Sequence, residues 1–150
     1  MSMSGLQMMR FVIAILAVAG AAVSALALQV HYSTATEPCS INERWDCGVV
    51  NHSPFAVVGP VPVAAIGIVG YLAMAVLALR RQRFLLHVAA LAGLIFALRL
   101  TFIEEFDLLV WCLYCVTSQG IIALISLLSL GWLAVEYFRL KRGEKQGSGT

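Results

Sequence analysis

Four long runs of apolar residues, separated by short polar segments, set the pattern of this chain. They cover residues 11–30, 61–79, 84–103 and 108–135. An α-helix rises about 1.5 Å per residue and the hydrocarbon core of a bilayer is about 30 Å thick, so about 20 apolar residues can cross it. Because the runs are continuous rather than alternating, they favour helices over the strands of a membrane barrel. The pattern predicts an all-α integral membrane protein with four transmembrane helices and a polar tail at about 139–150.

The composition supports this class. Hydrophobic residues make up 61% of the chain and charged residues only 12%. A soluble domain usually has about twice that charged fraction, so an ordinary soluble fold is excluded. A length of 150 residues leaves room for a single domain, 1–150.

The first apolar run has a second possible interpretation, as a cleaved signal peptide. Arg10 precedes the run, and Ala25-Leu26-Ala27 near its end could form a cleavage site. Signal peptides, however, usually have an apolar core of about 7–15 residues, and this run is longer. We therefore expect a retained helix.

The basic residues predict the orientation. Most lie before the first run, between the second and third, or after the fourth: Arg10, Arg80, Arg81, Arg83, Arg139, Lys141, Arg142 and Lys145. By the positive-inside rule these segments face the cytoplasm, so both termini lie inside. The loop at 31–60 and the short turn at 104–107 then lie outside. We expect a multi-pass protein of the inner (cytoplasmic) membrane, in contact with the lipid bilayer.

The four cysteines lie in or next to these outer segments. Cys39 and Cys47 are in the long loop, while Cys112 and Cys115 form a CxxC motif near the outer end of the fourth run. Static disulfides would suit the loop pair, but a bridge between residues three apart on one helix is normally strained and reducible. Zinc is a second alternative, although one CxxC inside an apolar helix is an unusual ligand set. Redox exchange fits best, and we expect no metal.

The position of the CxxC motif in the fourth run predicts which of its cysteines faces the outer loop and which faces the bilayer. Asp107 is a candidate N-cap, which would place Cys112 about 7 Å and Cys115 about 12 Å down the helix. Cys112 could then meet the loop, and Cys115 could meet a lipid-soluble oxidant. The helix dipole weakens beyond the first turn and three acids lie nearby, so the sequence gives no ground to assume strong activation of Cys112.

The electron acceptor follows by elimination. The chain has no glycine-rich phosphate turn after a strand, and no pair of histidines on spanning helices that would hold haem. A membrane quinone, entering between helices, is the natural acceptor. We expect no nucleic-acid partner.

Three stretches resemble the vitamin K epoxide reductase family: Asp46-Cys47-Gly48-Val49-Val50-Asn51-His52-Ser53-Pro54-Phe55, Gly59-Pro60-Val61-Pro62 and Trp111-Cys112-Leu113-Tyr114-Cys115. The resemblance implies a four-helix bundle around a quinone pocket capped by the outer loop. It also implies that Cys112 and Cys115 are the active pair. Cys115 would face the quinone, Cys112 would exchange with Cys47, and the Cys39–Cys47 disulfide would meet a partner. A bacterial quinone-linked thiol oxidase with four helices is a look-alike, but its cysteine pairs come in the opposite order.

The resemblance also suggests quinone contacts at Ser53 and Phe55, and Gln119 could donate a hydrogen bond to a quinone oxygen. Ser53 could instead be the N-cap of a short helical segment that begins at Pro54. Gln119 could instead make a polar contact between helices. Vertebrate members have tyrosine at the position of Gln119, which argues against vitamin K epoxide as the substrate.

Together these features predict a quinone-dependent thiol–disulfide oxidoreductase that oxidises a thioredoxin-fold partner outside the cytoplasm, with menaquinone or ubiquinone as acceptor. Many bacterial relatives carry a fused thioredoxin-like domain; this sequence stops at Thr150, so we expect a separate partner protein. One alternative is a quinone or vitamin K epoxide reductase whose main product is the reduced quinone. Another is a non-enzymatic membrane subunit with structural disulfides.

Overall fold

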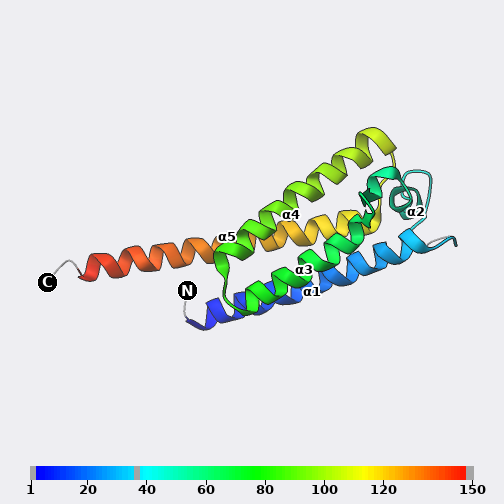
Figure 1. The fold of residues 1–150 in the computed structure, drawn as a ribbon. Coiled ribbons are helices and arrows are strands. Elements are labelled where there is room, and N and C mark those ends of the chain that lie inside the picture. Colours follow the sequence, from blue (N-terminus) through cyan, green and yellow to red (C-terminus); the bar gives the residue numbers. More distant parts are fainter. Residues whose placement is uncertain (1–2, 36–37, 148–150) are drawn as a thin grey trace.

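The computed structural model describes residues 3–35 and 38–147, most of which are helical (Figure 1). Two short elements, the helix α2 and the 3₁₀ turn η1, lie in the loop that follows the first long helix, and a small hairpin leads into the next. In chain order the elements are α1 (Met3–Tyr32), α2 (Cys47–Asn51), η1 (Pro54–Ala56), β1 (Val57–Val58), β2 (Val61–Pro62), α3 (Val63–Leu79), α4 (Arg83–Ile103), the π-helical η2 (Glu104–Leu108) and α5 (Leu113–Gly147).

Three of the described helical stretches are long and apolar enough to cross a membrane: Ser4–Tyr32, Arg83–Leu108 and Leu113–Gly143. The protein is therefore a mostly helical membrane protein, as the sequence predicts. The second predicted run does form a helix, but α3 has only 17 residues, or about 25 Å. The count of four spans stays a prediction.

The predicted start of the fourth helix is wrong. The π-helical segment η2 continues α4, and Leu109 then takes a left-handed backbone conformation with a φ of 55°. A left-handed non-glycine residue cannot continue a right-handed helix. The chain therefore breaks at Leu109, and α5 begins at Leu113 rather than at residue 108. Asp107 is not its N-cap. At the other end, α5 continues to Gly147, through much of the segment predicted as a polar tail; residues 148–150 lie outside the described residues.

Small residues allow α1 and α3 to pack closely. A Cβ atom on Gly20 would overlap the ring of Tyr71, and one on Gly67 would come within 2.8 Å of Ser24 Oγ. Tyr71 cannot easily move aside, because its hydroxyl donates to the carbonyl oxygen of Ser118, 2.7 Å away on α5. Such close contacts at small residues are typical of helices packed in a membrane. They make α1 an integral part of the bundle.

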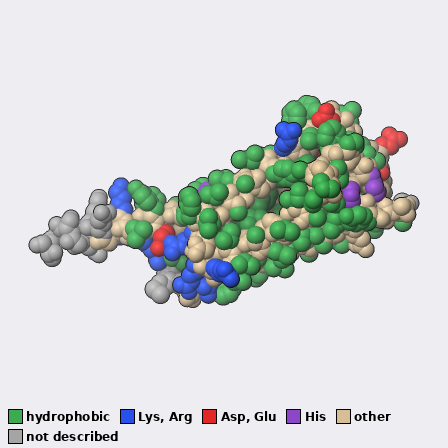
Figure 2. Space-filling model, viewed as in Figure 1, with side chains coloured by type: hydrophobic (Ala, Val, Ile, Leu, Met, Phe, Trp, Pro, Cys, Tyr) green, Lys and Arg blue, Asp and Glu red, His purple; other side chains and the backbone are tan. Residues whose placement is uncertain are grey.

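The outer surface of the long helices is apolar. Figure 2 shows hydrophobic side chains along the length of the bundle, and large ones such as Ile15, Val69, Ile95 and Leu127 are about two-thirds exposed. In water such a surface would be an aggregation hazard, whereas in a bilayer it faces lipid. Charged side chains gather at the ends instead: most Lys and Arg lie near the N-terminus and the α3–α4 turn, and most acidic side chains lie at the opposite end with the loop.

Candidate redox site

Backbone hydrogen bonds join the loop to the segment just before α5. The amide of Trp111 donates to the carbonyl oxygen of Arg44 over 2.8 Å, and the amide of Asp46 donates to that of Trp111 over 3.0 Å. The rings of Trp45 and Trp111 lie 6.1 Å apart beside this bridge. The two segments run parallel at this point, with Trp45 opposite Trp111, and the residues that directly follow Asp46 and Trp111 pack in the same cluster. Those residues are Cys47 and Cys112.

All four cysteines meet in one buried cluster. Cys39 and Cys47 form a disulfide, with Cα atoms 5.7 Å apart, while Cys112 and Cys115 are free thiols. The side chains of Val30 and Val50 complete the packing around them. Cys47 and Cys112 are fully buried. Cys47 and Cys112 are 65 residues apart in sequence. The fold nevertheless brings the loop pair and the CxxC motif into one cluster.

Asp46 holds the loop cysteine in place. Its carboxylate accepts hydrogen bonds from the amides of Gly48 (2.8 Å) and Val49 (3.2 Å), which caps α2, and from the hydroxyl of Ser40 (2.8 Å). The Ser40 hydrogen bond is the main cause that lowers the pKa of Asp46, and the two amides and His52 add to it. The ionised carboxylate therefore stabilises the start of the helix on which Cys47 lies.

Asn51 links the loop to the CxxC motif. Its side-chain amide donates to the carbonyl oxygen of Cys47 (2.8 Å) and to Cys112 Sγ (3.5 Å). His31 at the end of α1 donates from Nδ1 to the carbonyl oxygen of Asn51 over 2.6 Å. The sequence did not single out Asn51, because nothing near it indicates that its side chain faces a residue 61 positions later.

Cys112 itself caps α5. Its carbonyl oxygen accepts the first helical hydrogen bond, from the amide of Val116 (3.0 Å), and its sulfur accepts from the amide of Cys115 (3.4 Å). A sulfur at this position faces the positive end of the helix dipole and has Asn51 as a second donor. Both features stabilise a thiolate. The expectation that Cys112 lies a full turn below the helix start is therefore wrong, and with it the argument that the helix dipole is too distant to act on Cys112.

Glu104 lies beside the CxxC motif rather than in an exposed outer turn. Its side chain is only 2% exposed, and its carboxylate accepts from the amide of Cys112 over 3.1 Å. The sequence predicted a short turn at 104–107 on the outer side, but did not predict that Glu104 is buried in it. A usable signal was present, because Glu104 directly follows a long apolar run, and an ionisable residue at such a depth often marks a functional site.

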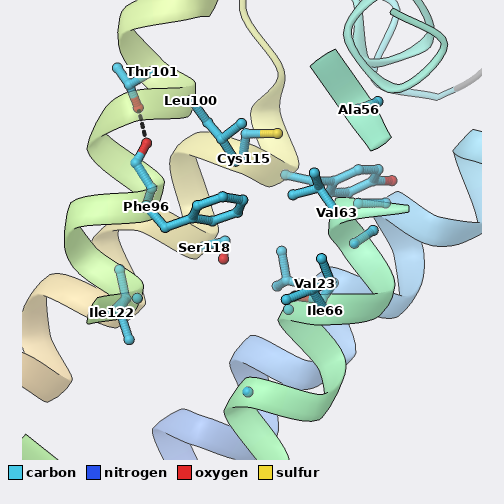
Figure 3. Close-up of a pocket in the computed structure, with 18 of the residues that line it drawn as sticks. Val23, Ala56, Val63, Ile66, Phe96, Leu100, Thr101, Cys115, Ser118 and Ile122 are labelled. Carbon is cyan, nitrogen blue, oxygen red and sulfur yellow. Dashed lines mark hydrogen bonds between the residues drawn. The ribbon is translucent and has the colours of Figure 1, made fainter. Parts of the chain in front are cut away.

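A cavity of about 400 Å³ lies next to Cys115. In Figure 3 the side chains of Cys115, Phe96 and Ser118 point into the same space, opposite Val63 and Ile66 of α3. The lining is mostly apolar, with a few polar groups that include Glu104 and Asn51. A predominantly apolar cavity of several hundred Å³ with a few placed polar groups is typical of small-molecule sites.

The predicted quinone contacts divide into two groups. Ser53 and Phe55 both line the cavity. Ser53 also takes the N-cap position of η1, but its hydroxyl donates back to the carbonyl oxygen of Val50 (2.7 Å) and makes no cap hydrogen bond. Gln119 is not among the lining residues. Its Oε1 accepts from the hydroxyl of Thr101, the contact between helices that the sequence left as its alternative role.

The family model for the vitamin K epoxide reductase family matches residues 11–140 of the chain. No curated protein matches the chain. Within the described residues, 3–35 and 38–147, no group of three or more His, Cys, Asp or Glu side chains is placed to hold a metal ion.

The cap on α2 predicts a pH-dependent loop. A carboxylate whose pKa is lowered in the folded protein stabilises the fold fully when the pH is above its ordinary pKa. This stabilisation is lost as the pH falls through the pKa of the folded state. Asp46→Ala should therefore destabilise α2 by about 0.5–2 kcal/mol at neutral pH, and by less at acid pH, where the wild type loses the same charge. Hydrogen exchange of the Gly48 and Val49 amides measures this.

Glu43→Ala is the matched control for that experiment, because Glu43 is an exposed acid in the same loop. It should leave the protection of both amides unchanged. Equal protection in Asp46→Ala and the wild type at neutral pH would contradict the capping role.

Proposed function

The chain belongs to the vitamin K epoxide reductase family, and from this premise we propose that it is a membrane thiol–disulfide oxidoreductase that transfers electrons from a protein dithiol to a quinone. The observation that carries the proposal is the convergence of Cys39, Cys47, Cys112 and Cys115 in one cluster, with Cys115 lining an apolar cavity. A structural protein has no need for free thiols packed against a disulfide beside a cavity.

The relay begins in the loop. A thiolate of a separate thioredoxin-fold partner attacks the Cys39–Cys47 disulfide, and the partner's second thiol completes its own oxidation, which leaves Cys39 and Cys47 reduced. Cys47 then attacks an oxidised Cys112–Cys115 bond at Cys112 and releases Cys115. Cys39 finally attacks the mixed disulfide, which closes Cys39–Cys47 again and releases Cys112. The arrangement in the structure, a closed loop disulfide with two free thiols, corresponds to this last state.

The cavity supplies the site for the acceptor. When bound, a quinone such as menaquinone or ubiquinone takes up two electrons and two protons. The apolar lining suits its ring, and Ser53 and Phe55 contribute from the loop, which caps the cavity in this proposal. Gln119 acts indirectly, by holding Thr101, a lining residue of α4. Re-forming the Cys112–Cys115 bond releases the two electrons and two thiol protons that the acceptor requires.

Glu104 is the residue placed to handle a proton. It is buried, lines the cavity and contacts the backbone of Cys112. We assign it the role of accepting a thiol proton from the CxxC pair and passing it toward the quinone oxygen. A carboxylate in that position needs no water to reach the cysteines, and a fixed proton acceptor typically contributes about 10²–10⁴ in rate.

The same proposal includes the orientation. Four spans place both termini in the cytoplasm and the cysteine cluster outside, in an inner membrane, because the basic residues gather at the end opposite the loop. The external compartment is the one in which disulfides persist.

Substitution of the cysteines tests the relay. Cys115→Ala should reduce quinone consumption to background, because the CxxC pair can no longer form its disulfide. In the double variant Cys39→Ala/Cys115→Ala, Cys47 and Cys112 have only each other as neighbouring partners and should be found as a disulfide by non-reducing peptide mapping. Cys47→Ala/Cys115→Ala is the control and should yield far less of the corresponding Cys39–Cys112 bond. Normal quinone turnover by Cys115→Ala would overturn the assignment.

Replacement of Glu104 separates proton transfer from positioning. Glu104→Gln keeps an oxygen that can accept the Cys112 amide hydrogen bond but cannot take up a proton. Quinone turnover should fall by about 10²–10⁴-fold, while thiol exchange at Cys39–Cys47 with a small dithiol and the melting temperature stay close to wild type. Glu105→Gln is the neighbouring control: Glu105 is partly exposed and faces Arg44 at 3.8 Å. Unchanged turnover in Glu104→Gln would show that the carboxylate takes no part in proton transfer.

The orientation can be tested with single cysteines in a chain whose native cysteines are replaced by alanine. Glu43 in the loop and Arg142 near the end of α5 are both exposed. A membrane-impermeant maleimide applied to intact cells should label Glu43→Cys. It should label Arg142→Cys only after the membrane is permeabilised. The opposite pattern would reverse the orientation.

A further inference from the structure

A second pocket lies at the end of the bundle opposite the cysteines and is independent of the proposed redox function. It has a volume of about 200 Å³ and is formed where α1, the α3–α4 turn, the start of α4 and the later part of α5 meet. Figure 2 shows basic side chains gathered at this end. The lining residues are Leu6, Gln7, Arg10, Arg81, Arg83, Trp132, Glu136 and Arg139.

The charges of this lining do not balance. Four arginines from separate segments share the pocket with one carboxylate, that of Glu136. Arg83 pairs with it, Nη1 to Oε1 at 2.8 Å, and its guanidinium lies 5.9 Å from the centre of the Trp132 ring. Arg10 and Arg81 form no ion pair with any residue in 3–35 or 38–147, so at least two positive charges of the lining have no carboxylate partner there. Arginines brought close together repel each other, and an anion between them removes that cost.

Arg10 provides a second, separate indication of a missing anion. Its Nε atom is buried and has no hydrogen-bond partner among the described residues, 3–35 and 38–147. The guanidinium lies over the ring of Phe11, 4.6 Å from the ring centre, a contact that supplies no conventional hydrogen-bond acceptor. A buried donor without an acceptor is rare in folded proteins and calls for a ligand or an ordered solvent molecule.

The start of α4 favours the same kind of ligand. This helix of 21 residues has no side-chain cap hydrogen bond and no acidic residue in its first turn. Its first residue is Arg83, a cation at the end of the helix dipole where anions are favoured. The N-terminus of α4 and the arginines therefore both favour an anion at this end of the bundle.

We propose that this pocket binds a phosphate group, supplied by the headgroup of an anionic phospholipid. The planar guanidinium group is well matched to phosphate oxygens. The pocket lies where long membrane helices end, and Leu6 and Trp132 give it an apolar side for the lipid's glycerol and upper chains. Basic pockets between helix ends on the cytoplasmic side commonly hold anionic lipid headgroups. The occupant bridges α1, α4 and α5 and so stabilises the bundle.

The test uses the whole protein in a neutral detergent, with its melting temperature followed as lipid is added. Phosphatidylglycerol should raise the melting temperature at concentrations where phosphatidylcholine does not. Arg10→Gln and Arg81→Gln should each weaken phosphatidylglycerol binding by about tenfold or more, since each removes a charged donor to the phosphate. Arg99→Gln is the control: it makes the same change in charge at an exposed position outside the pocket and should bind like wild type.

A third arm adds inorganic phosphate, which has the same chemistry without the chains. Stabilisation by phosphatidylglycerol alone identifies a lipid site, and equal stabilisation by inorganic phosphate identifies the free ion as the source. Arg81 lies in an exposed turn, so Arg81→Gln keeps the test valid if Arg10→Gln does not fold. Equal binding of the two lipids, or the same binding by Arg81→Gln and Arg99→Gln, would overturn the proposal.

Discussion

The short backbone bridge between the loop and Trp111 is the contact on which the redox centre depends. Two hydrogen bonds, from Trp111 to Arg44 and from Asp46 to Trp111, fix which loop residue faces the CxxC motif. A shift of this pairing by one residue would move the start of α2, and with it Cys47, relative to Cys112. The bridge is possible only because the left-handed Leu109 ends the π-helical segment and leaves residues 110–112 outside any helix. The break that the hydropathy pattern could not reveal is therefore what allows the two cysteine pairs to meet.

The helices could be predicted well, because length and apolarity are properties of the chain alone. Residues 11–30, 84–103 and most of 108–135 all lie within the long helices α1, α4 and α5. The errors are at the helix ends, where local hydrogen bonds decide. Asp107 has the side chain of a good N-cap, but Glu104 takes the amide of Cys112 and Cys112 itself caps α5. Propensity could not choose between these residues, because the choice depends on a loop 60 residues earlier in the chain.

The residues of the candidate site likewise fall into those that the sequence could predict and those that it could not. The cysteines could be found because their spacing and their position relative to the apolar runs are visible in sequence. Ser53 and Phe55 followed from a motif, and both line the cavity. Asn51 and Glu104 were missed because their importance depends on direction: each turns a polar side chain toward Cys112 from a different element. Gln119 is the opposite case. Its position four residues after Cys115 suggested a contact with the quinone, whereas its side chain binds Thr101 on α4.

The neighbours of Cys112 act on its sulfur in opposite directions. Asn51, the amide of Cys115 and the start of α5 all stabilise a negative sulfur, whereas the buried carboxylate of Glu104 lies on the other side of the same residue. Two negative charges at such close range repel strongly in an apolar environment, where water does not screen them. A thiolate at Cys112 and an ionised Glu104 therefore disfavour each other, so one of the two groups is favoured to keep a proton. When Cys112 enters a disulfide its charge disappears, and the carboxylate can ionise and release that proton. In the proposed relay this links the movement of electrons through Cys112 to the movement of a proton at Glu104, a coupling that a quinone reaction requires.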